Sequence, residues 1–139
     1  MKGRVKWVEA MTFVAESESG HALVMDGSPE VGGRNLGMRP MEMVLLGMAG
    51  CTAFDVVTIL KRGRHAVTDC SIEVTAERAE EHPKVFTRIH VQYTVSGRGL
   101  AEAAVARAVK LSAETYCSAS AMLGKTATIT HSHEIVAAE

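Results

Sequence analysis

The sequence of 139 residues has few aromatic side chains, few cysteines and no excess of charge of either sign. Aromatic residues make up only 4% of the chain, so the core must depend on aliphatic side chains and on eight adaptable methionines. The formal net charge is −1 and the basic residues are dispersed, so nucleic acid is not an expected partner. With 47% hydrophobic and 22% charged residues, the composition indicates a folded globular protein and excludes an intrinsically disordered chain.

The chain also lacks an uninterrupted hydrophobic run long enough to span a membrane. The longest run, from Met43 to Cys51, is about half of the roughly 20 residues that a transmembrane helix needs. Lys2, Arg4 and Lys6 have no apolar segment behind them, unlike the charged start of a signal peptide. We therefore expect a cytoplasmic protein that does not bind membranes. In that reducing compartment its three cysteines should rest as thiols.

The turn residues and the hydrophobic periodicity predict a single α+β domain over residues 1–139. Four glycines and a proline between Gly27 and Arg39 predict a long loop, and loops of this length are often lids over functional sites. Alternating segments predict strands, and apolar stripes at helical spacing predict helices. The expected strands are 5–8, 12–16, 22–26, 71–79, 85–95 and 126–136, and the expected later helices are 99–115 and 116–123.

Pro40 begins the helix that is expected to lie at the centre of the fold. Proline suits the first helical turn because its missing N–H would have no partner there, and Glu42 suits the positive end of the helix dipole. From residue 43 to 53 nearly every residue is apolar or small, so this helix has no polar stripe and should be buried on most sides. Lys61 and Arg62 are typical of its end. Cys51 is therefore expected in the middle of a buried helix.

Cys51 and Cys117 occupy positions where the environment of a thiol can be altered. The first lies in the predicted central helix, and the second lies at a break between two predicted helices. Burial raises the pKa of a thiol, whereas a helix N-terminus or a nearby cation lowers it. Free cysteine is also commonly a small buried hydrophobic residue, so composition alone leaves both a reactive and a structural role open. Cys70, at the start of a predicted strand, is interpreted as structural.

Two sequence strings around these cysteines resemble the motifs of a known family. The string PMEMVLLGMAGC, from Pro40 to Cys51, is similar to the proline-initiated helix that carries the first cysteine of the OsmC/Ohr family. The string YCSAS, from Tyr116 to Ser120, is similar to the second cysteine motif of that family. The separation of the two cysteines, with a hairpin and a helix between them, is also typical. The resemblance covers nearly the whole chain and is closest to the YhfA-like branch.

The resemblance implies an OsmC-like α+β fold in which antiparallel sheets wrap around a long central helix, completed in an intertwined homodimer. It also implies a thiol-dependent, peroxiredoxin-like reduction of organic hydroperoxides. Cys51 would be the peroxidatic thiolate, and Cys117 would be the resolving thiol that closes a disulfide with it. The partners would be a lipophilic peroxide or another apolar ligand and an external dithiol reductant. No cofactor or metal is expected.

The residues expected to support the reactive cysteine differ from those of the family's peroxidases. Those proteins support the reactive cysteine with a glutamate directly after the proline and with an early arginine. Here Met41 follows Pro40, and the acidic residue is Glu42, about 100° further around the helix. Arg34 and Arg39, from the preceding loop, are the candidate substitutes for the arginine. The alternative function is therefore a non-peroxidase binding or redox-sensing module with the same fold.

Three other groups of residues have simpler interpretations. His131 and His133 alternate on a predicted strand, a spacing compatible with a metal, but a solvated strand face is the expected explanation. A zinc protein built from these histidines and the cysteines is a third alternative. Asp55, one turn after Cys51, could tune the thiol, although a simple polar contact is favoured. Methionines at 38, 41, 43 and 48 fill a core more often than they line a pocket.

Overall fold

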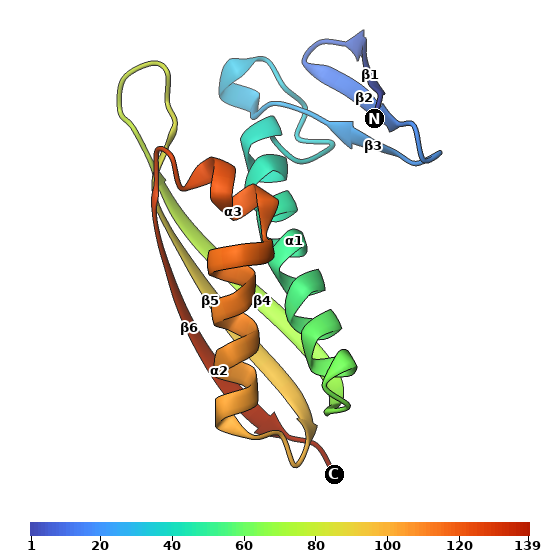
Figure 1. The fold of residues 1–139 in the computed structure, drawn as a ribbon. Coiled ribbons are helices and arrows are strands. Elements are labelled where there is room, and N and C mark those ends of the chain that lie inside the picture. The colour runs from blue at the N-terminus through green and yellow to red at the C-terminus, as the bar shows by residue number, and fades with distance from the viewer. The chain divides into compact units, whose positions relative to one another are not determined.

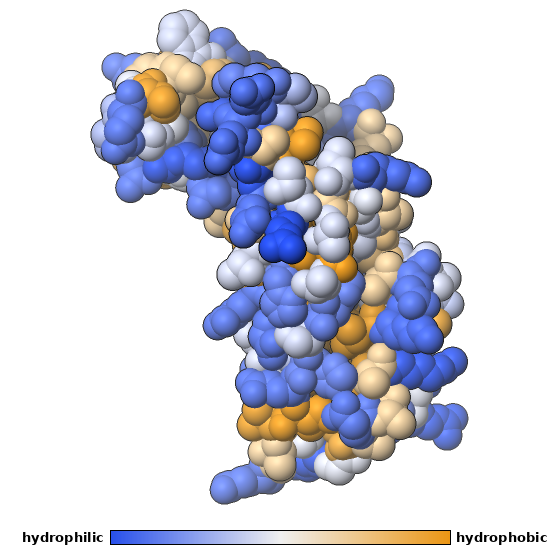
Figure 2. All heavy atoms as spheres, turned by 90° about the vertical axis from the view of Figure 1, so that its left-hand side faces the viewer, coloured by the Kyte–Doolittle hydropathy of each residue, from blue (hydrophilic) through white to orange (hydrophobic).

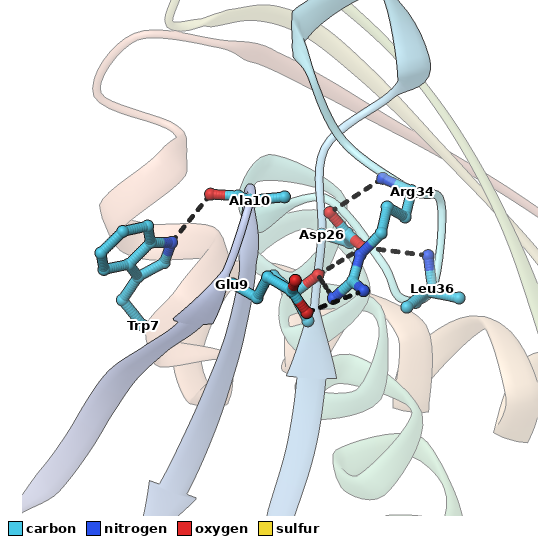
Figure 3. Close-up of polar contacts among 7 residues, drawn as sticks. Trp7, Glu9, Ala10, Asp26, Arg34 and Leu36 are labelled. Atoms are coloured by element: carbon cyan, nitrogen blue, oxygen red, sulfur yellow. Dashed lines mark hydrogen bonds and ion pairs between the residues drawn. The ribbon is translucent and has the colours of Figure 1, made fainter.

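A three-stranded antiparallel sheet lies in the first of two units in the computed structural model, which describes residues 1–139. This unit is Met1–Leu45. Trp7 closes the first turn by donating a hydrogen bond of 2.8 Å to the carbonyl of Ala10, a residue with a φ of +50° (Figure 3). The predicted meander of strands is confirmed. The elements are β1 (Gly3–Glu9), β2 (Thr12–Ser17), β3 (Ala22–Met25) and a short 3-10 turn, η1 (Pro29–Val31).

The carboxylate of Asp26, directly after β3, orders the start of the following loop (Figure 3). It is 2% exposed and accepts hydrogen bonds from the hydroxyl of Thr12 and from the backbone amides of Gly27, Arg34 and Leu36. Burial raises the pKa of this carboxyl, but the four hydrogen bonds favour its charged form and hold the pKa below its usual value. The predicted loop therefore has fixed backbone positions, and its role as a lid stays a prediction.

The second unit, Leu46–Glu139, is a three-stranded sheet with helices on one face (Figure 1). Figure 1 shows α1 and α2 side by side along this sheet, with β5 as the central strand. The prediction of one domain over residues 1–139 stays a prediction. The elements are α1 (Pro40–Arg62, mostly in this unit), β4 (Ala66–Arg78), β5 (Phe86–Arg98), α2 (Glu102–Leu111), the π-helical turn η2 (Ser112–Tyr116), α3 (Ser118–Leu123) and β6 (Thr128–Ala137).

The alternating sequence of β5 decides which face of the second sheet is buried. Ile89, Val91, Tyr93 and Val95 are at most 1% exposed, while the residues between them are only half-buried. Successive side chains of a strand point to opposite faces, so this apolar row lies beneath the helices. The helices contribute further core residues, which include Met48, Val56, Leu60, Val105 and Ala108.

Two features of the second sheet differ from the sequence prediction. β6 pairs with β5 in parallel, so this sheet is mixed and not antiparallel throughout. A parallel neighbour requires a long crossover connection, which α2, η2 and α3 provide. β4 also begins five residues earlier than predicted, at Ala66, so Cys70 lies inside the strand, paired with Val95, and not at its start. Burial, followed by the nearby charge of Asp69, raises the pKa of the Cys70 thiol.

The two histidines of β6 do not form a solvated strand face, contrary to the sequence prediction. In the parallel register His131 lies opposite Val91 and therefore points to the helix-covered face. Its ring stacks on Tyr93 with centroids 6.1 Å apart, its Nε2 is buried without a hydrogen-bond partner, and burial lowers its pKa. His133 Nε2 lies 2.6 Å from a carboxylate oxygen of Glu102 on α2. The pairing of β6 thus turns both residues inward.

α1 is less enclosed than the sequence suggests. Its 23 residues include an 18-residue window of mean hydropathy 2.0, so by length and composition it could cross a membrane, contrary to the estimate from the uninterrupted run. A core helix of a soluble protein passes the same test, and α1 buries Met48, Thr52, Val56 and Leu60. Its opposite side is exposed and includes Phe54, which is 76% exposed. The expectation of burial on most sides is therefore wrong for the isolated chain.

Much of the protein surface is hydrophilic. On the face shown in Figure 2, hydrophilic residues cover most of the surface, and apolar residues are visible between them. This distribution agrees with the dispersed charges of the sequence.

Candidate active site around two thiols

The structure brings the thiols of Cys51 and Cys117 close together, with the carboxylate of Asp55 beside them. The two sulfur atoms and a carboxylate oxygen all lie within 4.8 Å of one another. Cys51 and Asp55 are four residues apart on α1 and therefore occupy the same side of the helix. Cys117 comes from the junction between η2 and α3. These three groups belong to the second unit and form its candidate site.

Cys117 is the N-cap residue of α3 and the more buried of the two thiols. Its side chain is nearly inaccessible, at 3% exposure, whereas Cys51 is partly exposed. Its sulfur accepts hydrogen bonds from the amide and the hydroxyl of Ser120, at 3.4 and 3.0 Å. Burial raises the pKa of Cys117, the hydrogen bonds from Ser120 lower it, and the neighbouring Cys51 raises it, with a net increase. Cys117 is therefore a protonated thiol at neutral pH, and Cys51 is the more accessible sulfur.

The π-helical turn η2 determines where Cys117 begins α3. The amide of Cys117 donates to the carbonyl of Ser112 five residues earlier, at 2.8 Å. Such turns are rare and frequently occur at functional sites. Ser112 is fully buried at the start of this turn and contacts two side chains of α1. The predicted helix 99–115 missed this change, because hydrophobic periodicity does not report a single wider turn.

A chain of buried hydroxyl groups connects the central strand to the site. Thr52 Oγ1 lies 2.6 Å from the hydroxyl of Tyr93 and 2.7 Å from the hydroxyl of Ser112. The hydroxyl of Ser112 donates to Asp55 Oδ2 at 2.9 Å. Tyr93, Thr52 and Ser112 are each at most 1% exposed, so their hydroxyls depend on one another for hydrogen bonds. This network fixes the orientation of Asp55, and no pattern in the sequence indicates that its members meet.

We predict that Tyr93 ionises only at strongly alkaline pH. Burial raises its pKa from 10.0 to about 12, despite the opposing hydrogen bond with Thr52. In a Tyr116→Phe variant Tyr93 is the sole tyrosine, and tyrosinate absorbance should appear toward pH 12. Because the unfolded chain loses this proton near pH 10, stability should fall as pH rises from 10 toward 12. Ionisation near pH 10 in the folded protein would contradict this prediction.

Arg34, one of the predicted supporting residues, lies in the first unit and has its own partners there. Its guanidinium donates to a carboxylate oxygen of Glu9 at 3.2 Å and to the hydroxyl of Thr12 at 2.9 Å (Figure 3). These contacts attach the loop to the first sheet. A supporting role for Arg34 toward Cys51 stays a prediction.

Arg39 and Glu42, the other predicted supporting residues, lie at the start of α1 in the first unit. The carboxylate of Glu42 accepts the backbone amide of Arg39 at 2.8 Å, which satisfies a donor at the helix start. The guanidinium of Arg39 donates to the side chain of Asn35 at 2.8 Å and to the carbonyl of Gly37 at 3.1 Å. Both residues therefore have local structural contacts, and their catalytic roles stay predictions.

A cavity of about 530 Å³ lies next to Asp55 in the second unit. Two cations that sequence reasoning did not connect with the site, Arg62 of α1 and Arg107 of α2, contribute to its walls. The remaining walls are mainly apolar and include Phe54, Ile59, Leu111 and Tyr116. The cavity therefore combines apolar surface with positive charge next to Asp55.

Comparison with known proteins decides the family. The OsmC-like protein family model matches residues 32–132. The chain belongs to the OsmC-like family. It is 54% identical to protein YhfA of Escherichia coli K12 over 138 residues, which cover 99% of this chain and 100% of that protein. The family resemblance and the α+β fold class predicted from sequence are thus confirmed.

Solved OsmC-like structures have the same fold. A hypothetical protein from Aquifex aeolicus VF5 is 30% identical, with a TM-score of 0.86 over 99% of this chain and 97% of that chain. The organic hydroperoxide resistance protein OhrB of Bacillus subtilis is 18% identical, with a TM-score of 0.62 over 96% of each chain. The similarity to OhrB shows only that the two proteins share a fold.

Proposed function

We propose that this OsmC-like protein reduces organic hydroperoxides with Cys51 and Cys117. The observation that carries the proposal is the proximity of a partly exposed thiol and a buried, protonated one. A peroxidatic sulfur must be reached by substrate, whereas a resolving sulfur must only reach its partner. The name of OhrB, a protein with this fold, is consistent with such a substrate.

The proposed cycle has three steps. The thiolate of Cys51 attacks one oxygen of the peroxide, the O–O bond breaks, and the departing alkoxide takes up a proton to become an alcohol. Cys51 is then a sulfenic acid, and the thiol of Cys117 attacks its sulfur, releasing water and forming a disulfide. An external dithiol restores both thiols by exchange and is itself oxidised to a disulfide.

Electrostatics defines what the proposed cycle requires. The peroxidatic sulfur reacts as a thiolate, and a nearby cation favours that form. We assign this role to Arg34 or Arg39, with Glu42 as the supporting acidic residue, the candidates that the sequence predicts. Arg62 and Arg107 line the cavity next to Asp55 and add positive charge on that side. The apolar walls of the same cavity suit the organic group of a lipophilic peroxide.

We also propose that two copies of the chain form a homodimer. Leu46, Gly50 and Phe54 are spaced four residues apart, so they form one exposed stripe on α1. A Cβ atom added to Gly50 would meet nothing within 4 Å, so this stripe is open in the isolated chain. A second copy would cover it. We further propose that the protein is soluble and cytoplasmic and that it has no nucleic acid or membrane partner.

One observation favours the second candidate function, a redox-sensing or binding module. The raised pKa of Cys117 opposes thiolate formation at that sulfur. A protein without a supporting cation would form the disulfide slowly and would respond to sustained oxidation without rapid turnover.

The reaction of the fully reduced protein with cumene hydroperoxide tests the proposal. We expect the rapid loss of two thiols per chain, the release of cumyl alcohol, and a disulfide that mass spectrometry assigns to Cys51 and Cys117. Addition of a dithiol should restore both thiols and permit further turnover. Thiol loss no faster than that of a small free thiol would reject the peroxidase and favour the sensing or binding module.

A further inference from the structure

We propose that the reduced protein binds one Zn²⁺ ion per chain through Cys51, Asp55 and Cys117. These residues provide two sulfur ligands and one oxygen ligand from two elements that meet in the second unit. The sequence prediction considered zinc only with the histidines of β6 and did not identify this set. The three residues lie close together because the crossover between β5 and β6 places Cys117 next to α1.

The geometry of the three groups fits a tetrahedral ion. Cys51 and Asp55 stand four residues apart on one helix, the spacing at which two side chains of a helix hold zinc in a known class of sites. With zinc–sulfur bonds near 2.3 Å, neighbouring ligand atoms of a tetrahedron are about 3.7 Å apart. The ligand atoms here lie within 4.8 Å of one another, so contraction by about 1 Å at most would close the site. The fourth position is left for water or a small ligand.

Hydrogen bonds hold two of the three ligands in place. One carboxylate oxygen of Asp55, Oδ2, accepts the hydroxyl of Ser112, which leaves the other oxygen for a metal. The sulfur of Cys117 accepts two hydrogen bonds from Ser120. Hydrogen-bonded ligands of this kind are typical of metal sites, because their orientation is set before the ion arrives. Both supports lie in the second unit, so the site does not depend on any residue of the first.

The chemistry of the ligands selects zinc over the abundant hard cations. Thiolates are soft ligands that suit zinc, whereas calcium and magnesium require oxygen ligands. Binding converts each thiol to a thiolate and releases its proton to the solvent, so no oxidant or reductant takes part.

Zinc would use the same sulfur atoms as the proposed peroxide reaction. Coordination to zinc lowers the nucleophilicity of both sulfur atoms, so zinc should slow the reaction reversibly, and a chelator should restore its rate. Only this consequence rests on the proposed function. Binding itself requires only reduced thiols and is measured without peroxide.

The test uses the full-length protein, reduced and kept free of oxygen. Co²⁺ serves as the spectroscopic probe, because thiolate coordination produces charge-transfer absorption in the near ultraviolet, and Zn²⁺ should displace it at one ion per chain. A chromophoric chelator in competition gives the zinc affinity. We expect Cys51→Ser and Cys117→Ser to lose the absorption, and Asp55→Asn to weaken zinc binding by more than about tenfold. Cys70→Ser, which removes a cysteine outside the site, should bind like the unaltered protein.

Several results would overturn the inference. They are the absence of thiolate-to-cobalt absorption in the unaltered protein, equal affinity in Asp55→Asn, and a loss of binding in Cys70→Ser. The spectrum of the unaltered protein decides the question even if a variant fails to fold. A protein that binds zinc but does not react with cumene hydroperoxide would retain this inference and reject the peroxidase. A protein that reacts with cumene hydroperoxide but does not bind zinc would retain the peroxidase and reject this inference.

Discussion

Cys51→Ser should abolish the peroxide-dependent loss of thiols, whereas Cys117→Ser should keep the first step and stop the second. Serine is not a useful nucleophile toward the O–O bond here, because its hydroxyl is not ionised at neutral pH. Without Cys117, the sulfenic acid on Cys51 has no neighbouring thiol to condense with and should accumulate. A sulfenic-acid trap and mass spectrometry identify the modified residue after a single addition of cumene hydroperoxide.

Cys70→Ser is the matched control for both variants. Cys70 is half-buried in β4, and its thiol has a raised pKa, so its removal should change neither the rate nor the number of thiols lost rapidly. The assignment fails if Cys51→Ser still loses a thiol at the original rate. It also fails if the trap labels Cys117 in the otherwise unaltered protein before it labels Cys51.

Thr52→Val should destabilise the protein by about 1–3 kcal/mol, the typical cost of an unsatisfied buried hydroxyl. Valine has nearly the shape of threonine, but it leaves the hydroxyl of Tyr93 without its partner at 0% exposure. It also removes the contact at Ser112 that positions the donor to Asp55. The free energy of unfolding from denaturant titration, with unchanged slope, measures the effect.

The double variant Thr52→Val/Tyr93→Phe distinguishes a hydrogen-bond effect from a packing effect. Replacing both partners by apolar groups of similar shape is close to neutral, so the double variant should recover part of the lost stability. If the double variant is as unstable as Thr52→Val, or if the effects of the two single substitutions simply add, the hydroxyl pair does not stabilise the fold. The double-mutant cycle yields the coupling between the two residues directly.

The sequence by itself determined the local elements and the family. The alternation of β5 and the run of turn residues after β3 set strand and loop positions, because these signals act over a few neighbouring residues. Pro40 marked the start of α1, for the same reason. The strings around Cys51 and Cys117 identified the family before any fold was known, since each string is continuous in the chain.

Only the tertiary structure decided which distant residues meet. The parallel pairing of β6 depends on the crossover through α2, and it turned His131 toward Tyr93 instead of toward solvent. The contacts of Ser112 with α1 depend on one wider helical turn that periodicity cannot encode. In the sequence Asp55 is a single acidic residue in an apolar helix, and packing placed its carboxylate beside two thiols. Such contacts form because burial of the apolar faces brings separate elements together, and the polar groups carried with them must find partners there.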